Sequence, residues 1–310
     1  MSMDASEQIE RRLSELRIRW GDFWPEDDLS AIAADVRRRI GRAGDAWALD
    51  ELEPLPGGHV AFTARGERDG EAVVLKVNPR EHPDARDLLA EGEALRFWAP
   101  TGAAVRLLDE RDDGFTLLLE QLRPGTPLDA AGLAWEERLT TLGRLVARLH
   151  RAGTPPASLP RLGGDYADGW RRSLADDTAS LAELELLLRP AADDLLLHAD
   201  LHGGNALRDG GEWRAIDPHA LRGDRHADVW ALIDPFAPAL PDEPRAAAEE
   251  ARRWLALYAP AAELEPERAA AWTRLRARAE ALAIDRDGFT ASDENRAWAA
   301  RLHRIANALA

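Results

Sequence analysis

The sequence of 310 residues contains no cysteine. This absence excludes a disulfide framework and any thiolate-based metal or catalytic site, and it suits a reducing cytosol. The sequence also has no apolar run long enough to span a bilayer, and its first residues lack the basic and apolar regions of a secretory signal. We therefore expect a cytoplasmic protein that has no membrane partner.

Excess positive charge is missing as well, since the formal net charge is −16 at pH 7. Nucleic-acid backbones are bound by clustered cations, so a nucleic-acid partner is not expected. The acidic balance would suit a cationic small molecule, although a solvated acidic surface explains it equally well.

Lysine is almost absent from the sequence. Lys76 is the only lysine among the 40 basic residues, and the rest are arginine. A lysine ammonium is a compact charge on a flexible stem, whereas a guanidinium is a broad planar fork, so the two do not substitute for each other at a crowded phosphate. Lys76 is therefore a candidate ligand for the α- and β-phosphates of a nucleotide.

The first 45 residues have the apolar spacing of amphipathic helices, and short strands are predicted over residues 48–52, 60–65 and 72–77. These strands indicate a small antiparallel sheet, with Lys76 on the third strand. The turn that contains Gly57 and Gly58 would let backbone amides approach phosphates, or it is simply a turn.

A helix is predicted next, beginning at Pro83-Asp84 and ending near Trp98. Glu91 falls on its apolar stripe, whereas Glu93 lies on the far side. A carboxylate on a buried face needs a partner, and Lys76 is the obvious one. In kinases, such a lysine–glutamate pair directs the ammonium toward the nucleotide phosphates.

A hairpin over residues 105–109 and 115–120 leads into an extended segment that ends at a Pro-Gly turn. This segment is typical of a hinge between two lobes, where the backbone groups of Gln121 and Leu122 could pair with adenine. Beyond it the chain is mainly helical. Helices are predicted over residues 135–150, 170–188, 243–258, 266–283 and 291–309.

The stretch from Leu195 to His219 contains the densest group of polar side chains. A hairpin turn at Asp209-Gly210 would bring Asp217 close to Asn205. Together with Asp200, these residues form a set suited to phosphoryl transfer: one carboxylate accepts a hydroxyl proton, while an amide oxygen and a second carboxylate hold Mg²⁺.

Two other interpretations of this stretch remain open. His198, Asp200 and His202 alternate along extended chain and could ligate zinc in a metal-dependent hydrolase. Alternatively, His198 is a buried residue that shapes the loop, and His202 lies at the surface. A kinase-like binding protein without turnover is disfavoured because no required group is missing.

In their order along the chain, these parts resemble the aminoglycoside phosphotransferase family, specifically its streptomycin 6-kinase and hydroxyurea phosphotransferase branch. The similarity covers about residues 45 to 235. The segments that carry it are Gly57-Gly58-His59-Val60, Val74-Leu75-Lys76-Val77, Glu91 with Ala94-Leu95-Arg96, Val105-Arg106-Leu107-Leu108, Leu117-Leu118-Leu119-Glu120, Arg123-Pro124-Gly125-Thr126-Pro127-Leu128, Leu145-Val146-Ala147-Arg148-Leu149-His150, His198-Ala199-Asp200-Leu201-His202-Gly203-Gly204-Asn205 and Ala215-Ile216-Asp217-Pro218.

The resemblance implies an α+β, protein-kinase-like fold with two lobes. Residues 1–120 would form the N-lobe, in which a helical extension over residues 1–45 precedes the nucleotide-binding sheet and its helix. Residues 121–310 would form a helical C-lobe that carries a catalytic loop at 198–205 and a metal loop at 217–219.

The resemblance also implies ATP and Mg²⁺ as cofactors, and it suggests a role for each polar side chain. Asp200 would be the catalytic base, Asn205 and Asp217 would bind the metal, and Lys76 with Glu91 would orient the phosphates. The reaction would transfer the γ-phosphoryl group to a hydroxyl group of a small molecule.

The sequence departs from the branch at two positions. Ala199 stands where the branch usually has glycine, and His219 stands where it usually has lysine. Neither change removes a group that the mechanism needs, but His219 could alter what docks beside the metal. Asp217-Pro218-His219 replaces the Asp-Phe-Gly motif of protein kinases, so no activation-loop switch is inferred.

The resemblance leaves the acceptor open between a streptomycin-like aminocyclitol and another small hydroxyl compound, such as a hydroxyurea-like molecule or a metabolite. Streptomycin carries two guanidinium groups, so its site would need several carboxylates. Asp165, Asp168 and Asp234 are the candidates. Asp224 and Asp228 are better explained as residues that cap a helix or brace the catalytic loop.

Overall fold

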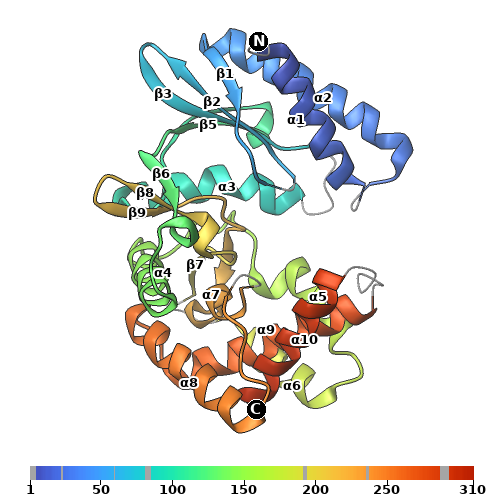
Figure 1. The fold of residues 1–310 in the computed structure, drawn as a ribbon, viewed down its shortest axis with the longest axis vertical. Coiled ribbons are helices and arrows are strands. Elements are labelled where there is room, and N and C mark those ends of the chain that lie inside the picture. Colours follow the sequence, from blue (N-terminus) through green and yellow to red (C-terminus); the bar gives the residue numbers. More distant parts are fainter. Residues whose placement is uncertain are drawn as a thin grey trace. The chain divides into compact units, whose positions relative to one another are not determined.

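The computed structural model describes residues 5–21, 24–58, 60–80, 85–190, 194–234, 237–286 and 293–310. The chain divides into two compact units, shown in Figure 1. The N-terminal unit contains residues 1–99 and 105–123, and the C-terminal unit contains residues 100–104 and 124–310. The division that we predict after residue 120 lies close to the point where the chain passes from one unit to the other.

The N-terminal unit is built on a five-stranded antiparallel sheet in the order β1-β2-β3-β5-β4. The three predicted strands and the predicted hairpin are all present. Asp69 and Gly70 adopt φ values of 53° and 78°, as a tight turn between two strands requires. The strands are β1 (Asp50–Pro54), β2 (Phe62–Arg68), β3 (Glu71–Val77), β4 (Leu107–Arg111) and β5 (Thr116–Glu120).

The predicted N-terminal helical region forms two helices, α1 (Ala5–Trp20) and α2 (Glu26–Trp47), which lie beside the sheet in Figure 1. Their apolar faces share one buried cluster with Val73, Leu75 and Val77 of β3. Because successive side chains of a strand point to opposite faces, Lys76 lies on the face away from these two helices.

Helix α3 (Ala85–Trp98) packs against the face of the sheet that carries Lys76. Its Gly92 lies so close to the sheet that an added Cβ would be 3.6 Å from a methyl carbon of Leu117 on β5. This close packing brings the neighbouring Glu91 to the sheet. The start that we predict for this helix, Pro83-Asp84, lies outside the described residues.

The C-terminal unit is mainly helical, and most of the predicted helices are present. The single helix predicted over residues 170–188 is wrong, because the chain forms two helices there. Asp177 accepts a hydrogen bond of 3.1 Å from the Ser180 N–H and so caps the start of a new helix. The helices are α4 (Trp135–His150), α5 (Ala167–Ser173), α6 (Thr178–Leu187), α7 (Trp230–Ile233), α8 (Pro244–Ala261), α9 (Pro266–Arg286) and α10 (Asp293–Ala308).

Two small sheets complete the C-terminal unit. The predicted hairpin is present as β8 (Ala206–Asp209) and β9 (Glu212–Ala215), with Gly210 at a φ of 56° in its turn. Strand β6 (Pro124–Pro127) adds to this hairpin, a pairing that local sequence patterns do not indicate. A separate pair is formed by β7 (Leu195–Leu197) and β10 (Leu221–Gly223).

Among the helices of the described ranges, none is both long enough and apolar enough to cross a membrane.

Candidate active site

The only lysine of the chain lies in a buried ion pair. Lys76 Nζ is 2.5 Å from Glu91 Oε2, and the two residues are only 5% and 2% exposed. Burial removes both charges from water, and close pairing offsets part of that desolvation cost. The pair therefore fixes the ammonium on one face of the sheet, as the helix pattern predicts, whereas Glu93 is partly exposed on α3.

The predicted catalytic loop leaves the end of β7 and is braced by a carboxylate from a distant part of the chain. Asp228 accepts hydrogen bonds from the backbone N–H groups of His198, at 3.0 Å, and Ala199, at 2.9 Å. Its carboxylate also lies 3.2 Å from His150 Nε2. Burial alone would raise the pKa of Asp228, but these hydrogen bonds hold it below its usual value. Asp228 therefore acts as a charged brace for the loop.

Ala199 has a φ of 64°, in the left-handed region that glycine favours. This conformation costs an alanine roughly 1–2 kcal/mol, so it requires support from its surroundings. Asp228 holds the Ala199 N–H, and Arg276 of α9 donates to the Ala199 carbonyl at 2.8 Å. The buried guanidinium of Arg276 lies over the rings of Trp230 and Trp170, at 4.3 and 5.5 Å from their centroids. Sequence reasoning misses Arg276 because no motif surrounds it.

Asp200 and Asn205 meet as the motif spacing predicts. Asn205 Nδ2 donates to both the carbonyl and the carboxylate of Asp200, at 3.0 and 3.1 Å. The Ile216 N–H donates to the Asn205 carbonyl at 3.0 Å, and this places Asp217 one residue beyond that contact. Burial and the nearby charge of Asp217 raise the pKa of Asp200 to about 7, against the opposing charge of Arg276.

These side chains suit a divalent cation. The Asn205 amide group turns its Nδ2 toward Asp200, so its Oδ1 is directed elsewhere and is able to coordinate. The mutual repulsion of Asp200 and Asp217 is the kind of strain that a bound cation relieves. An amide oxygen and a carboxylate are the hard ligands that Mg²⁺ prefers.

The histidines of the loop do not form a zinc site. His198 is fully buried, its Nε2 donates to the Ile216 carbonyl at 2.9 Å, and its Nδ1 accepts a long hydrogen bond of 3.4 Å from the Asp200 N–H. Burial lowers the pKa of His198 to about 4, so the ring is neutral. His202 accepts from the Gly204 N–H, and its Nε2 is 4.0 Å from Asp200 Oδ2. Within the described ranges, no three His, Cys, Asp or Glu residues are grouped to hold a metal ion.

The other predicted nucleotide residues lie in the N-terminal unit. Gly57 and Gly58 have φ values of 93° and 69°, so both need the freedom of glycine at this turn. The Gln121 N–H donates to the Ala72 carbonyl at 3.3 Å and continues the sheet, and Leu122 is buried. Adenine pairing by the backbone of these two residues stays a prediction.

The predicted acceptor carboxylates differ in their surroundings. Asp234 is buried, and its charge acts on both Asp200 and Arg301. Asp168 is half-exposed and lies 2.8 Å from Arg171 of its own helix. The side chain of Asp165 lies outside the part that the structure describes. Asp234 therefore lies close enough to influence Asp200.

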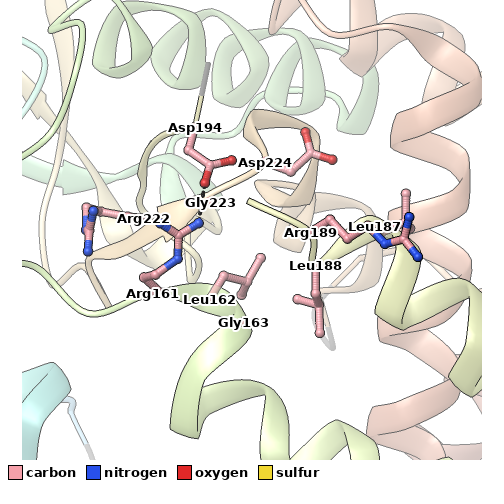
Figure 2. A pocket seen from close by; sticks show the side chains of 10 residues that line it. All are labelled: Arg161, Leu162, Gly163, Leu187, Leu188, Arg189, Asp194, Arg222, Gly223 and Asp224. Atoms are coloured by element: carbon pink, nitrogen blue, oxygen red, sulfur yellow. Dashed lines mark hydrogen bonds and ion pairs between the residues drawn. The ribbon is translucent and has the colours of Figure 1, made fainter. Parts of the chain in front are cut away.

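A cavity of about 10 Å³, large enough for about one water molecule, lies beside β10. Figure 2 shows the side chains that line it. Arg161 donates to Asp194 at 2.5 Å beside this cavity (Figure 2). Arg222 donates to the Leu159 carbonyl at 2.7 Å. None of the predicted catalytic residues lines it. We assign these contacts to the support of the β7–β10 pair, whose strand β7 leads into the predicted catalytic loop.

The chain matches one family of known sequences and several solved structures that share its fold. The sequence model of a family described as aminoglycoside/hydroxyurea antibiotic resistance kinase matches residues 47–288. No sequence among the curated proteins matches the chain.

Among solved structures, the amicoumacin kinase hAmiN, in complex with AMP-PNP, Ca²⁺ and Ami, matches with a TM-score of 0.60 and 17% identity over 88% of this chain and 93% of its own. The aminoglycoside phosphotransferase APH(4)-Ia, in a ternary complex with ADP and hygromycin B, matches with a TM-score of 0.56 and 19% identity over 86% and 97%. The choline kinase LicA from Streptococcus pneumoniae has a TM-score of 0.53 and 13% identity over 88% and 98%. At these identities the similarity shows the fold, which is the protein-kinase-like α+β fold.

Proposed function

The chain belongs to the aminoglycoside/hydroxyurea antibiotic resistance kinase family, and from this premise we propose that it transfers the γ-phosphoryl group of ATP to a hydroxyl group of a streptomycin-like aminocyclitol. As a member of this family, the protein is a small-molecule phosphotransferase that acts on a hydroxyl group. The acceptor, the residue roles, the use of Mg²⁺ and a cytoplasmic location are parts of the proposal.

The observation that carries the proposal is the Lys76–Glu91 pair. A buried lysine normally lowers the stability of the fold. All of the remaining 39 Lys and Arg positions of this chain are arginine. The compact ammonium, held by Glu91 at 2.5 Å, has the chemistry to bind nucleotide phosphates without the width of a guanidinium. A zinc-dependent hydrolase mechanism does not explain why Lys76 and Glu91 are paired in this position.

Asp200 is the proposed base for the acceptor hydroxyl. Asn205 holds its carboxylate at 3.1 Å, while Asp228 and Arg276 fix the backbone of the preceding residue. This rigid loop presents one carboxylate oxygen in a defined position, which is what general-base catalysis requires. His202 and His219 each place a ring nitrogen within 4.0 Å of Asp200 Oδ2, the oxygen to which Asn205 also donates.

Asn205 and Asp217 are the proposed metal ligands. When bound, Mg²⁺ would neutralise the negative charge of the phosphates during transfer. Asp217 is exposed and has a φ of 57°, a conformation that a short polar side chain tolerates better than most. That backbone geometry turns the chain just after β9, and the charge of Asp217 acts on Asp200.

A polycationic acceptor is favoured over a neutral one by the acidic character of the site. Asp234 is buried near Asp200 and adds negative charge to a chain whose net charge is already −16. A guanidinium or ammonium group of the acceptor would pair with that carboxylate in a charge-assisted hydrogen bond. Arg301 competes for the same charge, so the acceptor cation would share Asp234 with it.

The test uses purified protein with ATP and Mg²⁺, incubated in turn with streptomycin, hydroxyurea and uncharged polyols. Mass spectrometry should detect the addition of one phosphoryl group to streptomycin and not to the uncharged compounds. In the Asp234→Asn variant, the KM for the acceptor should rise by about tenfold while the KM for ATP is unchanged. Transfer to an uncharged acceptor, with none to streptomycin, would refute the proposed acceptor class.

A further inference from the structure

Helix α1 lies outside the part of the chain that the family model matches, which begins at residue 47. Three of its residues follow at intervals of four, so Arg12, Leu16 and Trp20 lie on one face of the helix. All three are buried. Leu16 and Trp20 belong to the apolar cluster beside the sheet, whereas the Arg12 guanidinium and the Trp20 indole N–H are polar groups that need partners there.

Those partners are backbone carbonyls of the glycine turn between β1 and β2. Arg12 Nη2 donates to the carbonyl of Gly57 and lies 3.5 Å from the carbonyl of Gly58. Trp20 Nε1 donates to the carbonyl of Val60 at 2.9 Å. One face of α1 therefore holds the segment between β1 and β2 at two points, Gly57-Gly58 and Val60.

These contacts also determine where the turn directs its N–H groups. In a planar trans peptide, the C=O and the N–H point in opposite directions. Because the Gly57 carbonyl points toward α1, the Gly58 N–H of the same peptide points away from α1. Lys76 also lies on the side of the sheet away from α1, and Gly58 is exposed. The Gly58 N–H is thus presented where a phosphate oxygen could accept its hydrogen bond.

We infer that Arg12 and Trp20 are positioning residues for nucleotide binding: they hold the Gly57-Gly58 turn so that its amide faces the phosphates of ATP. Arg12 additionally places a guanidinium charge directly behind the peptide that faces the phosphates, where it strengthens the binding of an anion. Glu15, at 3.1 Å from Arg12 Nη1, orients the guanidinium. This inference rests on the proposed function, because it assigns the turn to ATP.

The test compares a ligand that has phosphates with one that has none. Binding of AMP-PNP in the presence of Mg²⁺ and binding of adenosine are measured by isothermal titration calorimetry. Arg12→Gln should weaken AMP-PNP binding by about tenfold and leave adenosine binding unchanged. Trp20→Phe, which keeps the apolar ring and removes the N–H donor, should show a smaller loss in the same direction.

Arg19→Gln is the matched control, because Arg19 is an exposed arginine of the same helix that does not contact Glu15. It should bind both ligands as the wild type does. A purely structural role for Arg12 would weaken both ligands equally or neither, and either result overturns the inference. If Arg12→Gln does not fold, then Arg12→Lys and Trp20→Phe decide the question by the same comparison.

Failure of the inference is separable from failure of the proposed function. If the wild type does not bind AMP-PNP, or if Lys76→Met does not weaken its binding, the proposed function is wrong and the inference falls with it. If AMP-PNP binding depends on Lys76 but not on Arg12 and Trp20, only the inference is wrong.

Discussion

At the scale of single residues, the proposed chemistry depends on side chains whose charge is set by their neighbours. Lys76 and Glu91 are buried together, and Asp200 is held by Asn205 next to the second carboxylate of Asp217. Lys76 and Glu91 would each be unfavourable alone, because an unpaired buried charge is strongly destabilising. Single substitutions at these positions therefore separate nucleotide binding from chemistry.

Replacing Asp200 with asparagine should abolish phosphoryl transfer and leave ATP affinity nearly unchanged. The carboxylate acts on the acceptor hydroxyl and not on the nucleotide, and general bases contribute about 10²- to 10⁴-fold to the rate. Turnover on a confirmed acceptor and the dissociation constant for AMP-PNP should be measured on the same preparation. Wild-type turnover in this variant would show that Asp200 is not the base.

Replacing Lys76 with arginine should raise the KM for ATP and lower turnover, together by about 10- to 100-fold in kcat/KM. The charge is retained, but the planar fork cannot occupy the buried position beside Glu91 in the same geometry. Glu91→Gln should reproduce part of this defect. Glu93→Gln on the same helix is the control, and equal defects at both glutamates would contradict the assigned roles.

At the scale of elements, the catalytic loop is shaped by close contacts that only glycine permits. An added Cβ on Gly203 would lie 2.9 Å from the Cβ and 3.1 Å from the backbone nitrogen of Asp129. Asp129 belongs to a short helical turn over residues 128–130 that follows β6. The loop and this turn are therefore packed backbone against backbone. A larger residue at position 203 would force one of the two segments to move.

Replacing Gly203 with alanine should lower the free energy of unfolding by about 1–3 kcal/mol and reduce turnover, because overpacking displaces the loop that carries Asp200. Urea denaturation and steady-state kinetics provide the two measurements. Gly211→Ala is the control, since an added Cβ there meets nothing within 4 Å. The prediction fails if both variants behave alike.

At the scale of the whole molecule, long-range contacts join α9 to the strands and loops around the proposed catalytic residues. Asp224 accepts hydrogen bonds from Trp272 Nε1 at 2.6 Å and Arg268 Nε at 2.5 Å. The N–H and the ring Nδ1 of His226 contact the same carboxylate. Burial opposes ionisation of this group, but these hydrogen bonds lower the pKa of Asp224 to about 2.

This shift predicts a loss of stability in acid. A carboxylate whose pKa is depressed in the folded state stabilises the fold above its unfolded pKa, and that contribution disappears as the pH falls through the folded value. For Asp224 the window runs from about pH 4 to about pH 2 and involves about 2 kcal/mol. Urea denaturation at pH 6, 4 and 3 should show the decline, and Asp224→Asn should be less stable at pH 6 but should lack this part of the decline.

The sequence by itself determined the elements and the main polar residues, because both are encoded locally. Apolar periodicity identified the N-terminal helices, the strands and the helix that carries Glu91. The use of lysine at only one position singled out Lys76, and motif spacing identified Asp200, Asn205 and Asp217. The turn at Asp209-Gly210 sufficed to predict that Asn205 and Asp217 approach each other.

Only the tertiary structure decided what holds these residues in place. Asp228 and Arg276 reach the catalytic loop across 29 and 77 residues of chain, and Arg12 reaches Gly57 across 45. The strained φ of Ala199 and the two short helices in place of one over residues 170–188 were equally invisible in the pattern. Local propensity carries no information about which distant side chain will satisfy a given backbone group, because that choice depends on how the packed elements meet.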